Sequence, residues 1–71
     1  MATRIDAHIA GTVWKIEVKV GDSVTAGQVV VILESMKMEM PVEAAGPGTV
    51  SAILVQEGQA VEEGQAVVEL S

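Results

Sequence analysis

Gly11-Thr12-Val13 occurs a second time in this chain as Gly48-Thr49-Val50, 37 positions later. From Gly11 to Glu34, 12 of the 24 positions carry the same residue as the position 37 further on, far more than chance would give. The chain therefore contains an internal repeat. One short meander is marginal in water, so we expect each copy to bury its apolar face against the other.

Each copy has the pattern of a strand, a turn, a short strand, a turn and a strand. In the first copy, Trp14, Ile16, Val18 and Val20 alternate with charged residues, which predicts a half-buried strand with these four side chains facing inward. Ile53 is expected to face inward like Val18. Glycines supply the positive φ that tight turns need, and they stand at the predicted turns of both copies, at positions 21, 27, 58 and 64.

The segment that joins the copies contains Pro41 and Pro47, which argue against a helix there. Leu54 stands where the first copy has Glu17, so we expect a bulge or a small exposed apolar spot at this position. The fold predicted from these patterns is all-β: a flattened β-barrel or sandwich whose two related halves face each other across a pseudo-two-fold axis. At 71 residues the chain is expected to be one domain, residues 1–71, with a thin core.

Composition excludes several classes of function. Ten acidic residues against four basic ones give a formal charge of −6, which disfavours nucleic acid and anionic membrane surfaces and suits partners with basic faces. An alternative interpretation is that the charge only keeps a small domain soluble. The chain has no cysteine, hence no disulfide or thiolate nucleophile, which fits the cytoplasm. The longest apolar run, Val29 to Leu33, is too short to cross a bilayer.

The junction between the copies is the candidate functional site. Strand-like residues end near Leu33 and resume at Met38, so Ser35-Met36-Lys37 must form a tight hairpin with Met36 and Lys37 as its central pair. Two-residue hairpin turns normally contain Gly, Asn or Asp, and this pair contains none of them. Local rules are broken most often at functional sites, and exposed methionines are adaptable recognition groups. The competing interpretation is that Met36 and Met38 fold back onto the core and Lys37 is an ordinary surface charge.

Glu34-Ser35-Met36-Lys37-Met38 closely resembles the attachment motif of biotinyl domains of the biotin carboxyl carrier type. The resemblance covers essentially the whole chain, because Gly11-Thr12-Val13, Gly21-Asp22 and Gly27-Gln28 also match the family. It implies a barrel-sandwich hybrid of two pseudo-symmetric four-stranded halves, with the modified lysine on the hairpin of one half. Two features depart from the family pattern. Ser35 replaces the more common Ala, and the segment from Val18 to Val24 lacks the protruding thumb of one bacterial subclass.

The resemblance also implies a mechanism and partners. A biotin protein ligase would couple biotin to Lys37, with Met36 and Met38 as its recognition residues. The biotinylated domain would then shuttle carboxylate between biotin carboxylase and carboxyltransferase subunits. The chain itself would be a non-catalytic carrier and a monomeric domain, without a metal.

Three alternatives belong to other classes. A lipoyl carrier, or a domain that accepts both biotin and lipoate, shares the fold, but lipoyl domains usually have Asp before the lysine and a small residue after it. An unmodified lipoyl-like interaction module has no reason to keep a lysine between methionines. An enzyme lacks support because His8 has no nucleophile or ligand cluster around it, so His8 is expected to be an ordinary strand residue. Glu62-Glu63 is expected to be a charged pair beside a turn and not a metal site.

Overall fold

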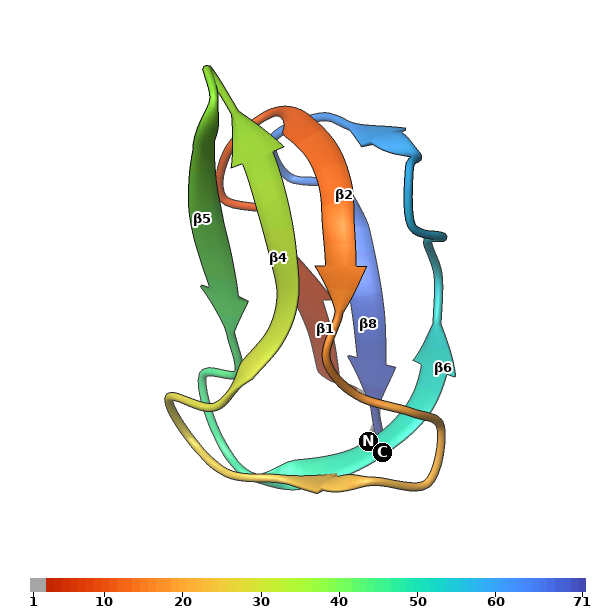
Figure 1. The fold of residues 1–71 in the computed structure, drawn as a ribbon. Helices are drawn as coiled ribbons and strands as arrows, with labels where there is room; N and C mark the ends of the chain where they lie inside the picture. Colours follow the sequence, from red (N-terminus) through yellow and green to blue (C-terminus); the bar gives the residue numbers. More distant parts are fainter. Residues whose placement is uncertain (1–2) are drawn as a thin grey trace.

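The computed structural model describes residues 3–71, in which every regular element is a β-strand (Figure 1). None of these residues forms a helix of the length and hydropathy that crossing a bilayer requires. The strands are β1 (Thr3–Asp6), β2 (Gly11–Ile16), β3 (Ser23–Val24), β4 (Val29–Ser35), β5 (Met38–Glu43), β6 (Gly48–Ile53), β7 (Ala60–Val61) and β8 (Ala66–Leu70).

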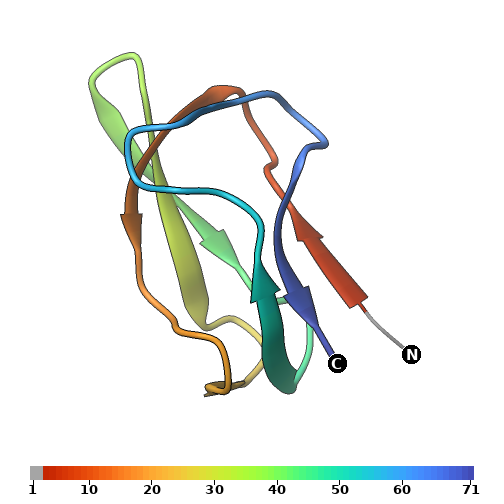
Figure 2. The same ribbon diagram turned by 90° about the vertical axis from the view of Figure 1, so that its right-hand side faces the viewer.

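The strands form two four-stranded sheets, in the orders β1-β8-β6-β3 and β5-β4-β2-β7, and every pairing is antiparallel. The two sheets face each other as a barrel-sandwich, which confirms the predicted all-β fold with two four-stranded halves. We call the sheet that contains the β4–β5 hairpin the tip sheet. Figures 1 and 2 show this hairpin extending beyond the rest of the molecule.

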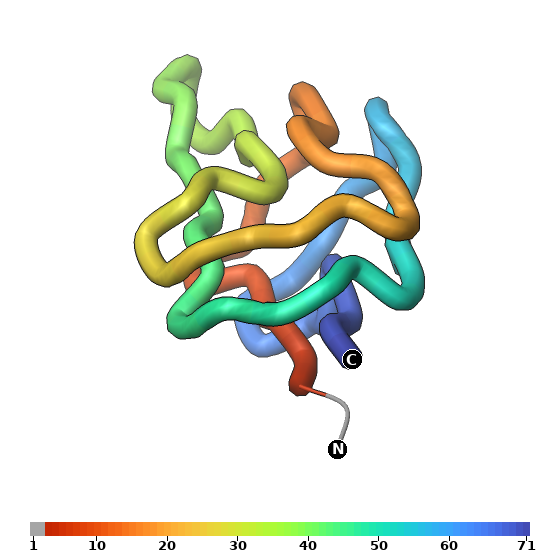
Figure 3. Tube along the Cα trace, turned by 90° about the horizontal axis from the view of Figure 1, so that it is seen from below, coloured from red at the N-terminus to blue at the C-terminus, as the bar shows by residue number. Residues whose placement is uncertain are grey.

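A shift of 37 positions converts one sheet into the other: β2, β3 and β4 correspond to β6, β7 and β8. The sheets are not the two repeat copies, however, because each copy contributes its short middle strand to the other copy's sheet. Thus β3 pairs with β6, and Figure 3 shows these two segments side by side. Backbone hydrogen bonds repeat with the same symmetry: Gly21 N–H donates to Val50 O at 2.8 Å and Gly58 N–H donates to Val13 O at 2.7 Å. The copies are interlocked, so neither could fold alone in this form.

The pseudo-two-fold also relates β1 to β5, beyond the segment in which sequence identity reveals the repeat. Thr3 pairs with Leu70 in one sheet as Met40 pairs with Leu33 in the other. The hairpin that joins β4 to β5 therefore has, as its symmetry equivalent, the ends of the paired strands β8 and β1, where Leu70 lies opposite Thr3. Figure 1 shows these strand ends at the end of the molecule opposite the hairpin.

The core lies between the sheets and is built mainly from valine, which supplies 11 of its 16 buried residues. Val30, Val31, Leu33, Val67 and Val68 are fully buried, and no polar or charged residue of the described part is buried. β-Branched side chains suit such a thin layer, because their restricted rotamers pack well on a pleated surface. The remaining core residues are Ile5, Ala7, Val13, Val18, Val24, Val42, Ala44, Val50, Val55, Val61 and Leu70.

The predicted inward row of the first strand is wrong in part. Trp14 and Val20 are exposed, Ile16 is half-buried and only Val18 is buried, while Val13 faces the core. The register of β2 against β4 shifts between Val13 and Lys15, and this bulge sends Trp14 outward. In the second copy, the buried residue that corresponds to Val18 is Val55, and Ile53 is only half-buried.

The predicted turns are confirmed. Gly21, Gly27, Gly58 and Gly64 all have positive φ, which glycine adopts without a steric penalty. In the turn at Gly21, Lys19 N–H donates to the Asp22 carboxylate at 2.9 Å and Asp22 N–H donates to Lys19 O at 3.0 Å. The segment that contains Pro41 and Pro47 has no helix, and Leu54 is the exposed apolar spot that its position predicted.

Candidate functional site

The hairpin tip is a two-residue turn between β4 and β5. Ser35 pairs directly with Met38, which leaves Met36 and Lys37 to reverse the chain (Figure 2). Their φ angles are +53° and +65°. Positive φ at both central residues is the signature of a type I′ turn, the turn whose twist matches that of the flanking strands. The predicted tip is confirmed in its position and in its central pair.

This backbone conformation is unfavourable for the residues that adopt it. Met36 and Lys37 are the only non-glycine residues of the described chain with positive φ. A side chain in this region strains the backbone by on the order of 1–3 kcal/mol, so the surrounding structure must impose it. Pairing of β4 with β5 from Val29 to Ser35, and of β4 with β2 on its other edge, supplies that constraint. The tip is thus a strained turn held by a rigid hairpin.

The side chains of the tip project into solvent. Met36 is 91% exposed and Met38 is 60% exposed, whereas Met40, two positions further along β5, is half-buried and packs against the core. The competing interpretation, in which Met36 and Met38 fold back onto the core, is therefore wrong. Neither methionine belongs to the hydrophobic core of the domain.

Lys37 is exposed, and within residues 3–71 its side chain forms no hydrogen bond or ion pair. The ion pair of this part of the chain joins Lys15 Nζ to Glu17 Oε1 at 3.8 Å. One row below the tip, Glu34 pairs directly with Glu39 across the strands. Like charges in this position repel each other, so the hairpin keeps them at a small cost in stability. The amine of Lys37 therefore has no partner within residues 3–71, and the part of the hairpin next to the turn carries two acidic residues.

Gly11 sets the position of the hairpin, a role that the sequence alone did not reveal. A Cβ at this glycine would lie 2.6 Å from the carbonyl oxygen of Glu34 and 3.4 Å from Cβ of Ser35. β2 therefore approaches the end of β4 more closely than any side chain would permit. The signal was present as the first residue of the repeated Gly-Thr-Val; at the second glycine, Gly48, the approach is looser, since a Cβ would lie 3.1 Å from the side chain of Leu70.

The other residues singled out from the sequence lie on separate loops. His8 is exposed in a bend between β1 and β2, not in a strand. Glu62 and Glu63 lie in the turn after β7, as predicted. In the described part of the chain, no three His, Cys, Asp or Glu side chains are placed to hold a metal ion.

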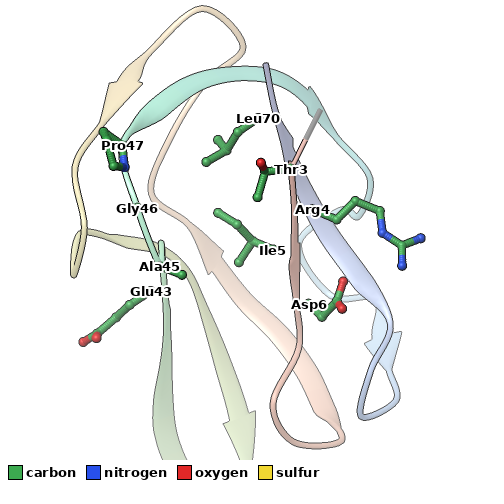
Figure 4. Close-up of a pocket in the computed structure, with 9 residues that line it drawn as sticks. All are labelled: Thr3, Arg4, Ile5, Asp6, Glu43, Ala45, Gly46, Pro47 and Leu70. Atoms are coloured by element: carbon green, nitrogen blue, oxygen red, sulfur yellow. The ribbon is translucent and has the colours of Figure 1, made fainter. Parts of the chain in front are cut away.

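A pocket of about 280 Å³ lies at the opposite end of the molecule, between β1 and the connection from β5 to β6 (Figure 4). Thr3, Ile5 and Leu70 point into it, whereas the charged ends of Arg4 and Glu43 point away. Its residues are Thr3, Arg4, Ile5, Asp6, Glu43, Ala45, Gly46, Pro47 and Leu70.

The pseudo-two-fold explains why this pocket exists. Thr3 and Gly46 occupy the positions that Met40 and Ile9 occupy near the tip, where both larger side chains pack against the core. The pocket is the volume that two smaller residues leave unfilled. It contains no part of the hairpin tip and is separate from the candidate site.

Comparison with known proteins shows which family of proteins this chain resembles. Residues 2–70 match the family model described as "Biotin-requiring enzyme". The chain is 46% identical over 67 residues to a biotin/lipoyl attachment protein of Bacillus subtilis, an alignment that covers 94% of this chain and 92% of that protein. It is also 48% identical over 60 residues to a biotin carboxyl carrier protein of Streptococcus mutans, which covers 84% of this chain and 46% of the relative.

Solved structures give the same result for the fold. The crystal structure of the Kluyveromyces lactis urea carboxylase contains a segment that superposes on all of this chain with a TM-score of 0.94 and 39% sequence identity. This chain spans 6% of the length of that protein. The fold thus occurs both as a small protein and as a minor part of a large one.

Proposed function

This chain is a biotinyl domain of the biotin-requiring enzyme family, and we propose that Lys37 is the residue that holds the biotin, through an amide bond at Nζ. The observation that carries this proposal is the hairpin tip. Among residues 3–71 it is the place where two non-glycine residues accept positive φ, and one of them is an exposed, unpaired lysine. Strain of this kind persists where function requires it.

The residues of the tip fit a covalent attachment site. Lys37 is exposed in the turn between β4 and β5, and Figures 1 and 2 show this hairpin extending beyond the rest of the molecule. The rigid pairing of β4 with β5 holds the base of the side chain while the side chain itself stays free to move. The two exposed methionines beside it offer a loading enzyme polarisable apolar contacts without any polar group that competes for the amine.

The attachment step is an acyl transfer in which this chain supplies the nucleophile. The neutral amine of Lys37 attacks the acyl carbon of biotinyl-adenylate, a new C–N bond forms, the C–O bond to phosphate breaks and AMP leaves. The amine loses one proton in the process. Within residues 3–71 no carboxylate or imidazole forms a hydrogen bond or ion pair with Lys37, so a biotin protein ligase would supply both the activated acyl group and the acceptor for the proton.

The attached biotin would carry carboxylate, and this chain would contribute its delivery. Because the cofactor is tethered, each transfer between a biotin carboxylase site and a carboxyltransferase site is intramolecular, with an effective concentration set by the tether. The domain needs no catalytic group for this role, and His8 and Glu62-Glu63 lie on other loops. Carboxylase subunits, or the other domains of a longer chain, are the proposed partners.

A lipoyl carrier is the second candidate, because the Bacillus subtilis relative is named for both cofactors. Met36 and Met38 favour biotin.

The test is to incubate the domain in parallel with a biotin ligase plus biotin and with a lipoate ligase plus lipoate, each with ATP, and to measure intact mass. A mass increase of one biotinyl group with the first enzyme supports the proposal. Modification by the lipoate ligase alone would replace it with the lipoyl carrier, and no modification by either would favour an interaction module.

A further inference from the structure

The pseudo-two-fold gives the two sheets the same backbone, yet their outer faces differ in chemistry. Cross-strand register places Lys15, Ile32 and Pro41 in one row on the outside of the tip sheet, with Trp14 beside them at the bulge. We call Trp14, Ile32 and Pro41 the apolar row. Trp14 is 47% exposed, Pro41 is exposed and Ile32 is half-buried.

The equivalent row on the other sheet is polar. Positions 37 away from Trp14, Ile32 and Pro41 are Ser51, Glu69 and Arg4, and register again places Glu69 beside Arg4. The Ser51 hydroxyl donates to the backbone oxygen of Glu69 at 3.0 Å. Because the backbones are equivalent, folding does not require the apolar residues on the outside of the tip sheet.

Along the hairpin, a pair of acidic residues lies between the apolar row and the tip. Moving along the hairpin, the outward residues after Ile32 and Pro41 are the paired Glu34 and Glu39, and Lys37 follows. At about 3.3 Å per strand residue, the apolar row lies roughly 13–17 Å from Lys37 along the strands. A single protein surface that received the tip would therefore cover the acidic pair and the apolar row together.

We propose that the outer face of the tip sheet, comprising the apolar row and the Glu34–Glu39 pair, is the docking surface for the ligase that acylates Lys37; this inference rests on the proposed function. The partner surface that fits it has an apolar patch for the indole of Trp14, and basic side chains nearer its active site that face Glu34 and Glu39. Charge complementarity of this kind guides encounter and orientation, while the buried aromatic residue contributes affinity.

The length of the lysine side chain favours the ligase over a carboxylase as the occupant. Before attachment, Nζ itself must come within roughly 3–3.5 Å of the reacting carbon. An extended lysine side chain reaches only roughly 6 Å from its Cα, by ordinary bond lengths. The ligase must therefore touch the hairpin itself, whose strands carry Glu34, Glu39 and, further along, Ile32 and Pro41 of the apolar row. After attachment, the longer arm lets carboxylase sites be reached with the domain further away.

The symmetry supplies matched variants for the test. Trp14→Ser and Pro41→Arg give the tip sheet the residues that the other sheet carries at the same positions, and Ser51→Ala and Arg4→Ala are the controls on that other sheet. Steady-state biotinylation of each variant separates docking from chemistry. A docking role predicts a KM raised about tenfold by Trp14→Ser with kcat unchanged, since an aromatic anchor is typically worth more than 1 kcal/mol. The controls should leave KM unchanged, because β6 and β1, which carry them, lie in the other sheet and outside the proposed docking surface.

A second measurement uses the unmutated domain, so it does not depend on the variants folding. Trp14 is the sole tryptophan of the chain and gives a single indole N–H signal in a 15N-labelled sample. Unlabelled ligase, added without ATP, should shift this signal together with the amide signals of Met36 and Lys37, and a higher salt concentration should weaken the effect.

Shifts confined to the tip amides, or an unchanged KM in Trp14→Ser, would overturn the proposed docking surface. An indole signal that responded to a biotin carboxylase subunit and not to ligase would also overturn it. These results would leave Lys37 as the attachment site, which peptide mapping of the biotinylated domain tests separately.

Discussion

Ser35 and Met38 are direct cross-strand partners, and the two residues between them turn the chain with φ of +53° and +65°. The strand ladder therefore reaches the last possible pair before the turn. Met36 and Lys37 have no freedom to relax into a longer loop. The strain of this turn and the exposure of Lys37 have the same structural cause.

Relief of this strain should stabilise the domain while removing the attachment residue. Lys37→Gly places the residue that prefers positive φ at the tip, so the free energy of unfolding should rise by about 1 kcal/mol. Lys37→Ala keeps a Cβ in the strained position and should change it by no more than about 0.5 kcal/mol. Thermal or denaturant melts of the two variants beside wild type make the comparison. Equal melting of Lys37→Gly and Lys37→Ala would show that the turn stores no strain.

Truncation in the core should have a much larger effect than any change at the tip. Leu33 is fully buried and only four positions from Lys37, and Leu33→Ala should lower stability by roughly 2–5 kcal/mol through lost burial and a residual cavity. Ile53→Ala removes a half-buried side chain and should have a smaller effect. The same melts test the order. A Lys37→Ala variant that melted as low as Leu33→Ala would mean that the tip is structural.

Gly11→Ala tests the close approach of β2 to the hairpin, and Gly46→Ala is its control. The Cβ of Gly11→Ala would lie 2.6 Å from Glu34 O, so β4 must shift, and stability should fall by about 1–3 kcal/mol. A Cβ on Gly46 meets nothing within 4 Å and its φ is not positive, so Gly46→Ala should be neutral or slightly stabilising. Denaturant unfolding of both variants distinguishes the two sites. Similar values for the two would contradict the packing described at Gly11.

The exposed methionines should determine the choice of cofactor. Met36→Asp combined with Met38→Ala removes both apolar contacts next to Lys37, so the rate of biotinylation should fall and lipoylation should be admitted. Parallel assays with the two ligases measure both rates, and Met40→Leu, on the half-buried methionine of the same strand, is the control. Unchanged biotinylation of the double variant would show that the ligase recognises another part of the domain.

The sequence predicted the tip, the turns and the strand order within each copy because these features are local. The turn glycines and the junction at Met36-Lys37 can each be recognised from the residue types at those positions and their immediate neighbours. The sequence did not predict that Trp14 faces solvent. A bulge between Val13 and Lys15 changes which side chains of the strand face inward, and the residue types alone do not reveal it. The prediction that Val18 faces inward is confirmed, but its buried counterpart in the second copy is Val55, and Ile53 is only half-buried against the core.

Features that depend on pairing between the copies were also beyond the sequence. The exchange of β3 and β7 between sheets requires the hydrogen bonds that join Gly21 to Val50 and Gly58 to Val13. Pairing of β1 with β8 was not predicted, because the identity between the copies does not extend to β1. The close approach at Gly11 appears only once β2 lies against β4.

The attachment of biotin to Lys37 is the central claim, and site mapping tests it most directly. The domain, its Lys37→Arg variant and a Lys15→Arg, Lys19→Arg double variant are each incubated with biotin, ATP and a biotin ligase, then digested and analysed by tandem mass spectrometry. The account predicts one biotin per chain on Lys37 in wild type and in the double variant, and none in Lys37→Arg. Biotin on Lys15 or Lys19 of the wild-type domain, or undiminished biotinylation of Lys37→Arg, would contradict it.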